Sequence, residues 1–240
     1  MTSVSALINA ARNGKSRRTI NTVYFDKTKV RKERGRFAFL KNASMEMNFE
    51  LIVVEPEKIN ELVSGNTHGG ICAVVSEAKY TELSSELIKD IGFSAVIEGV
   101  EDPYSLGYSL RALYACGCDS VILPRHLPSC ADSLLCKASA GASELLDIYV
   151  GDTFDLAAMF KQKRYTIACA AIPESSLCYE ADLSLPLLLV VGGEKRGISA
   201  KLMSICDKNV RIPYGREFMG SLSTASAVSI LSYEVLRQNS

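Results

Sequence analysis

The chain has 240 residues, 48% of them hydrophobic, and equal numbers of basic and acidic side chains, 27 of each. This composition supports a sizeable core in one large domain or two modest ones, and no apolar run approaches the roughly 20 residues that a membrane-spanning helix needs. The N-terminal charges follow a short apolar patch instead of preceding it, which argues against a signal peptide. We expect a globular cytoplasmic protein without membrane spans.

The eight cysteines and two histidines form no pattern typical of a metal site. Cys116 and Cys118 make only a Cys-x-Cys, no Cys-x-x-Cys occurs, and His68 and His126 are isolated. Without a secretory signal, we expect reduced and mostly buried thiols, surface or turn histidines, and neither zinc nor another metal.

The zero net charge hides a strongly basic segment. Between Arg12 and Arg36 there are ten basic residues and two acidic ones, a local charge of +8, so the rest of the chain carries −8. Such a segment favours a polyanion, most commonly a nucleic acid, over the alternative of a solvated mobile arm. Four aromatic residues among the charges could stack on bases or seat the segment on a small core: Tyr24, Phe25, Phe37 and Phe39.

The first 80 or so residues predict a small α/β unit. Helical spacing covers 3–13 and stops at Gly14, as at a helix C-cap. Strands are expected at 19–26, 49–56 and 69–78, a polar helix or loop at 29–45, and a short helix closed by Gly65. The polar, helix-like stretch 81–92 is the expected linker, which gives a domain at 1–85 and a second at 90–240.

The second half alternates strands and helices. Strands are expected at 94–100, 120–124, 147–152, 165–173, 187–191 and 210–213. Helices are expected at 106–117, around 133–139, at 155–164, near Ser199, and from about Ser221 to the C-terminus. Strands separated by helices predict a parallel sheet with helices on both faces.

The stretch LLLVVGGEKRG, from Leu187 to Gly197, is the most informative of these segments. A run of five apolar residues that stops at a Gly pair is typical of a strand buried on both faces. Gly192, Gly193 and Gly197 would let a ligand approach the backbone at the strand's carboxyl end, although an ordinary Gly-rich turn has the same pattern. The stretch matches neither the P-loop nor Gly-x-Gly-x-x-Gly.

Three segments resemble, in order, the three motifs of the SpoU/TrmH family of RNA ribose 2′-O-methyltransferases, in the SPOUT superfamily. EDPYSLGYSLR matches the first motif at Gly107 and Arg111, and VVGGEKRG matches the second at Gly192, Glu194 and Gly197. RIPYGREFMGSLS matches the third at Ile212, Pro213, Ser221 and Leu222. The resemblance covers roughly 95–238, and the preceding part looks more loosely like the small RNA-binding domain found in many members.

The resemblance implies a fold that periodicity alone would not predict. It is an α/β domain whose parallel sheet ends in a deep trefoil knot, preceded by a small α/β RNA-binding domain. S-adenosylmethionine (SAM) would be held in the knotted loops of a homodimer, and RNA would be the substrate. Small residues on the last helix suit a dimer contact, although packing within one chain would look the same: Ser221, Ser223, Ala225, Ser226, Ala227 and Ser229.

The resemblance also implies roles for individual residues. Arg111 would position phosphate or stabilise a developing alkoxide, since a guanidinium is a permanent cation and a poor base. Glu194 would accept hydrogen bonds from Arg111 or the substrate. The cofactor would be bound by Gly192, Gly193, Gly197, Ile212, Pro213, Ser221 and Leu222.

Two positions depart from the family pattern: Ser105 and Ser223 stand where the family has asparagines in the first and third motifs. Serine keeps one donor and acceptor but loses the reach of the amide. The leading hypothesis is an RNA 2′-O-methyltransferase acting on ribosomal or transfer RNA, with both serines near the chemistry. The alternatives are an RNA-binding protein of the same fold without catalysis and a nucleotide-dependent enzyme of ordinary doubly wound fold.

Overall fold

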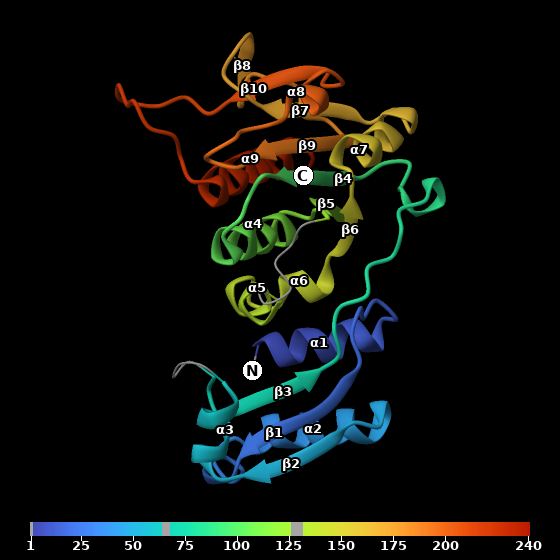
Figure 1. The fold of residues 1–240 in the computed structure, drawn as a ribbon, viewed down its shortest axis with the longest axis vertical. Helices are drawn as coiled ribbons and strands as arrows, with labels where there is room; N and C mark the ends of the chain where they lie inside the picture. The colour runs from blue at the N-terminus through green and yellow to red at the C-terminus, as the bar shows by residue number, and fades with distance from the viewer. Residues whose placement is uncertain (1, 64–67, 126–131) are drawn as a thin grey trace. The chain divides into compact units, whose positions relative to one another are not determined.

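The structure is a computed structural model that describes residues 2–63, 68–125 and 132–240. The chain forms two compact units, Met1–Lys79 and Tyr80–Ser240 (Figure 1). Two features expected from the sequence, the helix end at Gly65 and the setting of His126, lie outside the described residues. No helix within the described ranges is long and apolar enough to cross a membrane.

The first unit is a three-stranded sheet with helices. Strand β1 lies in the centre, parallel to β2 and antiparallel to β3. Its core joins Ile8 from the first helix, Phe25 from the central strand and Leu40 from the second helix, all fully buried. The elements are α1 (Thr2–Arg12), β1 (Ile20–Asp26), η1 (Lys27–Lys29), α2 (Arg34–Met47), β2 (Glu50–Val54), α3 (Pro56–Leu62) and β3 (Ile71–Val75).

The second unit is built on a parallel sheet of seven strands in the order β6-β5-β4-β9-β7-β10-β8. The predicted α/β architecture is therefore confirmed. The elements are η2 (Ser85–Leu87), β4 (Phe93–Glu98), α4 (Pro103–Ala115), β5 (Ser120–Pro124), α5 (Asp132–Ala138), α6 (Ala142–Leu145), β6 (Asp147–Gly151), α7 (Thr153–Gln162), β7 (Thr166–Ala170), β8 (Ser175–Leu177), β9 (Leu187–Gly192), α8 (Ala200–Met203), β10 (Lys208–Arg211) and α9 (Thr224–Gln238).

Alternate residues of the central strands bury against opposite helix layers. Leu187 and Leu189 of β9 face the cluster that contains the apolar residues of α4 and α9. Leu188 and Val190 face a second cluster formed with α7 and α8. Because successive side chains of a strand point to opposite faces, a strand covered on both faces must be apolar throughout, and this explains the run in β9.

Several boundaries differ from the sequence expectations for local reasons. The last helix begins at Thr224, not Ser221, because the Ser223 side chain caps it. The helix near Ser199 is a single short turn, α8, and the expected helix-like linker holds only the short η2 turn. The short edge strand β8 was not expected, since three residues carry too little pattern.

The expectation of reduced thiols is wrong for one pair. Cys169 on β7 and Cys206, just before β10, form a disulfide. The backbone N–H of Asp207 donates to the carbonyl oxygen of Ile167 at 2.9 Å, and this contact holds the segment that contains Cys206 beside β7. Two cysteines 37 residues apart, one in a strand and one in a loop, leave no spacing signal in the sequence.

Candidate functional site

The loops after β4 and β9 meet in the middle of the sheet. From β4 the chain proceeds to β5 and β6 on one side, whereas β7, β10 and β8 lie on the other side of β9. The boundary between β4 and β9 is thus a point where the direction of strand addition reverses, and ligands of open α/β sheets bind outside the carboxyl ends of strands at such points. Glu98 and Gly192, the last residues of the two strands, are register partners.

Of the three glycines at the end of β9 and in the turn that follows it, two make room for the chain's own backbone. A Cβ on Gly192 would meet the Gly197 carbonyl and would lie 2.6 Å from the nitrogen of Ile198, and a Cβ on Gly193 would meet the carbonyl of Gly99. Nothing lies within 4 Å of a Cβ on Gly197, which has a φ of +62°. Among these three glycines, only Gly197 leaves the open approach expected from the sequence. Gly192 lets the turn after β9 fold back closely on itself, and Gly193 lets this turn touch the loop after β4.

Glu194 bonds to the start of α9. Its Oε1 atom accepts a hydrogen bond from the backbone N–H of Thr224 at 3.2 Å, and the Thr224 hydroxyl donates to the carbonyl oxygen of Gly192, also at 3.2 Å. The second and third motifs therefore meet at the head of α9. In the described part of the chain, no hydrogen bond or ion pair joins Glu194 to Arg111, the partner expected from the sequence.

Ser223 serves as the N-cap of α9. Its Oγ accepts a hydrogen bond from the backbone N–H of Ser226 at 3.2 Å and lies 2.9 Å from the Ser226 hydroxyl. Serine and asparagine are among the best N-cap residues, because each places a side-chain oxygen near the free N–H groups of the first turn. The serine in place of the family's asparagine therefore preserves the cap.

Helix α4 presents its motif residues in three different settings. Arg111 is exposed, and no described residue pairs with it. Gly107 is buried, and a Cβ there would lie 2.5 Å from the Cβ of Ala138, so this glycine lets α5 pack closely on α4. Ser105 has a buried Oγ without a hydrogen-bond partner in the described structure, while its N–H donates to the capping Asp102 at 2.7 Å. An unpaired buried hydroxyl is costly, which makes Ser105 a candidate ligand contact.

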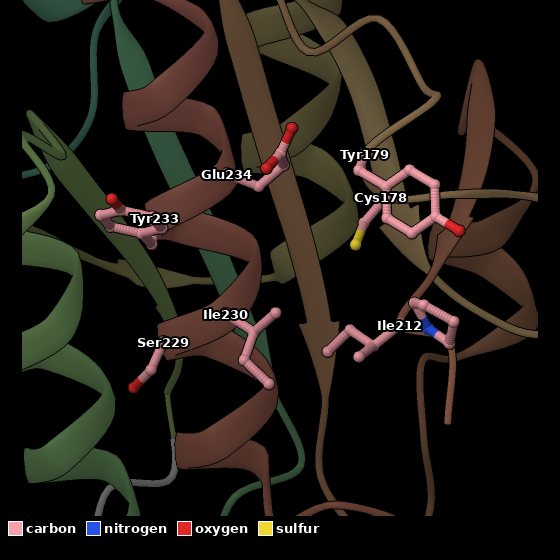
Figure 2. Close-up of a pocket in the computed structure, with 8 residues that line it drawn as sticks. Cys178, Tyr179, Ile212, Ser229, Ile230, Tyr233 and Glu234 are labelled. Atoms are coloured by element: carbon pink, nitrogen blue, oxygen red, sulfur yellow. The ribbon is translucent and has the colours of Figure 1, made fainter. Parts of the chain in front are cut away.

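The third motif is divided between two places. Ile212 and Pro213 border a hollow of about 520 Å³, in which Ile230 of α9 and Ile212 lie on facing sides and Tyr179 closes one end (Figure 2). Leu222 instead lies beside the head of α9, where its N–H donates to the Tyr214 hydroxyl at 3.1 Å.

Ser221 is exposed in the same loop as Leu222. Ser221 lies two residues before the N-cap Ser223, so it is near the end of α9 that Glu194 contacts.

Glu98 is a site residue that the sequence analysis did not identify. Its Oε1 accepts hydrogen bonds from the hydroxyls of Thr153 at 2.9 Å and Ser199 at 3.1 Å, and its Oε2 accepts from the Ser199 N–H at 2.7 Å. One carboxylate thus ties the end of β4 to the starts of α7 and α8. The available signal was a carboxylate at the end of an otherwise apolar strand, directly before a glycine.

Family models match both units. The model described as the SpoU rRNA Methylase family matches residues 92–233, which is more than half of the chain. The chain belongs to the SpoU rRNA methylase family. The model for the RNA 2'-O ribose methyltransferase substrate-binding domain matches residues 5–81. The resemblance drawn from the three motifs is confirmed, and the ordinary doubly wound nucleotide enzyme is excluded.

Named relatives of this SpoU protein align over nearly its full length. A putative TrmH family tRNA/rRNA methyltransferase from Staphylococcus haemolyticus is 28% identical over 92% of this chain and 89% of its own. The 23S rRNA (guanosine-2'-O-)-methyltransferase RlmB from Ralstonia nicotianae is 28% identical over 93% of this chain and 90% of its own.

Solved structures share the fold at lower identity. The AdoMet-bound rRNA methyltransferase from Sinorhizobium meliloti has a TM-score of 0.79 and 19% identity, covering 97% of this chain and 84% of that one. The SpoU methyltransferase AviRb from Streptomyces viridochromogenes, in complex with AdoMet, has a TM-score of 0.78 and 19% identity, covering 99% of this chain and 87% of that one. Both support the α/β fold described above.

Proposed function

We propose that this SpoU protein transfers a methyl group from SAM to a ribose 2′-hydroxyl of ribosomal or transfer RNA. The observation that carries the proposal is the meeting of the second and third motifs at the head of α9, where Glu194 and Gly192 both bond to Thr224. This meeting point lies at the carboxyl ends of the central strands, the position where open parallel sheets bind ligands.

The residues present fit the cofactor in two respects. Gly197 leaves open space beside the turn after β9, and the buried Ser105 hydroxyl is unpartnered among the described residues. Backbone groups of Ile212 and Leu222 and the rigid Pro213 are the proposed further contacts, with Ser221 and Gly193 in the same loops. When bound, SAM supplies the electrophilic methyl group, and the chain's own task is to position two bound groups and to assist one proton.

Arg111 is the proposed phosphate-positioning residue. It is exposed on α4, the helix that packs against α9, and it has no competing partner in the described chain. A permanently charged guanidinium with free donors can bind a phosphate or stabilise an alkoxide without a proton transfer.

A second copy of the chain is the proposed partner of the α9 surface that carries Ile230 and Tyr233. Ile230 and Tyr233 are exposed there by 41% and 61%, beside the hollow shown in Figure 2. Such an apolar face is typical of an interface. Tyr233→Glu should convert a dimer into a monomer in light scattering. The control Ser204→Glu, at an exposed residue directly after α8, should leave the mass unchanged.

The predicted trefoil knot and the cytoplasmic location belong to the same proposal. Strand β9 follows both β4 and β7 in the sequence but lies between them in the sheet. This arrangement supports the proposal that the C-terminal segment is threaded through the fold. The proposed RNA substrate supports a cytoplasmic location, since ribosomal and transfer RNA are used there.

The test is calorimetric titration with SAM and S-adenosylhomocysteine, followed by transfer of labelled methyl from SAM to ribosomal and transfer RNA. Saturable binding and label at a ribose 2′-oxygen are the expected results. The second candidate is a non-catalytic RNA-binding protein, favoured by Ser105 and Ser223 in place of asparagines. RNA binding without cofactor binding or label would establish that candidate and reject the first.

A further inference from the structure

The basic segment of the first unit divides into cations with partners and cations without them. The paired cations contact acidic or carbonyl groups at 2.5 to 2.8 Å: Arg12 with Glu46, Lys27 with Glu55, Lys29 with the Gly69 carbonyl, and Arg36 with Glu33. These side chains contribute to the unit's own surface network. Their donors are already engaged within the unit, so they are poorer candidates for binding an external polyanion.

Arg31, Lys32 and Arg34 differ from the rest. All three are exposed, and none has a hydrogen-bond or ion-pair partner within the described ranges. They lie within four consecutive positions, with Glu33 among them, from the turn after η1 to the first residue of α2. Consecutive Cα atoms are 3.8 Å apart, so the Cα atoms of the three residues lie within about 11 Å of one another. We refer to these three residues as the free basic turn.

The free basic turn does not help the unit to fold. Its charges repel one another, the first turn of α2 contains no acidic residue, and cations at the positive end of a helix dipole are unfavourable. Gly35, the second residue of α2, has nothing within 4 Å of the position where a Cβ would stand, so packing does not require a glycine there. The surface beside Arg34 is therefore open to close approach by a ligand.

Three of the four aromatic residues of the segment contact other residues of the same unit. The rings of Phe25 and Phe37 lie 5.3 Å apart, and Phe25 is fully buried. The Arg12 guanidinium covers Phe39, with its central carbon 5.2 Å from the ring centroid. Of the two roles that the sequence left open for these residues, seating the segment on a small core is the one that the contacts favour over base stacking.

We propose that Arg31, Lys32 and Arg34 form the phosphate-contacting surface of the first unit, and that this surface binds the RNA sugar-phosphate backbone without reading bases. The choice of RNA as the polyanion rests on the proposed function. Three neighbouring exposed cations can each contact a phosphate, and the contacts of Phe25, Phe37 and Phe39 within the unit leave these rings poorly placed to stack on bases.

The test compares two triple variants of the full-length protein that lose the same charge. The first is Arg31→Gln, Lys32→Gln and Arg34→Gln. The control is Lys27→Gln, Arg36→Gln and Lys58→Gln, whose cations are exposed and paired with Glu55, Glu33 and Glu61. The first variant removes exposed cations without partners among the described residues, and the control removes exposed ion pairs, which contribute little to stability. Both variants should therefore fold, and thermal melts followed by circular dichroism will verify this.

The measurement is anisotropy of a labelled single-stranded RNA of mixed sequence, titrated with protein without SAM at several KCl concentrations. The first variant should make the negative slope of log K against log salt less steep by about 2, since each phosphate contact on a single strand contributes about −0.7. The control should retain the wild-type slope. Equal losses in both variants would reveal a general field effect and overturn the proposal, as would an unchanged slope in the first.

The outcome is independent of the chemistry at the other unit. Calorimetry with SAM on the same first variant should give wild-type cofactor affinity. A wild-type protein that binds RNA through the free basic turn but never binds SAM would reject the proposed methyl transfer and retain this inference.

Discussion

Glu194 and Thr224 lie thirty residues apart in the chain and are joined by a hydrogen bond from the Thr224 backbone N–H to the Glu194 Oε1 atom. The bond connects the turn after β9 to the first residue of α9. A backbone donor needs an oxygen acceptor but not a negative charge. This relationship therefore gives the glutamate a positioning role that an amide can fulfil.

The first prediction separates that role from one based on charge. Glu194→Gln should retain SAM affinity, because the amide oxygen can still accept from Thr224. Glu194→Ala should weaken affinity by about tenfold, equivalent to about 1.4 kcal/mol for the lost bond. Calorimetry measures both, and Glu217→Ala, an exposed change in the neighbouring loop, is the control. A Gln variant as weak as the Ala variant would contradict the positioning role.

Ser105 and Ser109 offer a matched pair on α4. The Ser105 hydroxyl is buried without a partner in the described structure, whereas the Ser109 hydroxyl donates to the carbonyl oxygen of Ser105 at 2.8 Å. Ser105→Ala should leave the melting temperature unchanged or raise it, and should reduce methyl transfer if the hydroxyl contacts a ligand. Ser109→Ala should lower stability by about 1 kcal/mol. Unchanged methyl transfer in Ser105→Ala would remove Ser105 from the site.

The double variant Ser105→Asn with Ser223→Asn restores both family asparagines. Asparagine caps a helix as well as serine, so α9 should keep its start at Thr224. Methyl transfer should rise or stay unchanged, measured as label incorporated into RNA per unit time. A fall in activity, with an unchanged melting temperature, would mean that the serines are adapted to this protein's own substrate.

Glu98 should matter more than its neighbour Glu101. Glu98 accepts three hydrogen bonds at the carboxyl end of β4, whereas the contacts of Glu101 within the described residues are exposed ion pairs with Lys195 at 3.3 Å and Arg196 at 3.7 Å. Glu98→Ala removes three hydrogen bonds, one of them from the buried Thr153, and should lower stability by about 2 kcal/mol, whereas Glu101→Ala should cost less than about 0.5 kcal/mol. Chemical denaturation distinguishes the two, and similar losses would contradict the bracing role.

Much of the fold could be predicted from the sequence because it rests on local patterns. The apolar run of β9 and the alternation of strands and helices predict a buried parallel sheet. The motif order indicates the family. Non-local relationships could not be predicted: the three bonds of Glu98 join segments 55 and 101 residues away, and only the assembled sheet brings them together.

The glycines illustrate the same limit within the site. The sequence indicates that Gly192 and Gly193 are special but does not distinguish space for a ligand from space for the chain's own backbone. The answer depends on the loop after β4, whose Gly99 carbonyl occupies the space beside Gly193. Likewise, the basic segment is visible in the sequence, but the division into paired and free cations requires the positions of Glu46 and Glu55.

The final prediction concerns pH and the carboxylate of Glu234 at the edge of the hollow beside α9. Its Oε1 accepts hydrogen bonds from Arg237 and from Gln238, each at 2.7 Å, and Gln238 in turn accepts from the Leu183 N–H at 2.9 Å. Hydrogen bonds from the Arg237 guanidinium hold the pKa of Glu234 below its ordinary value, against the opposing effect of burial.

A carboxyl whose pKa is lowered in the folded state stabilises that state above its unfolded pKa of about 4.3, and this contribution disappears as the pH falls through the lower folded pKa. Wild type should therefore melt higher than Glu234→Gln near neutral pH, and the difference should shrink below about pH 4. Arg237→Gln should lose the same pH-dependent part, because it removes the cation that lowers the pKa. Melting curves recorded from neutral to acid pH measure the effect, and a constant difference between wild type and Glu234→Gln across that range would contradict it.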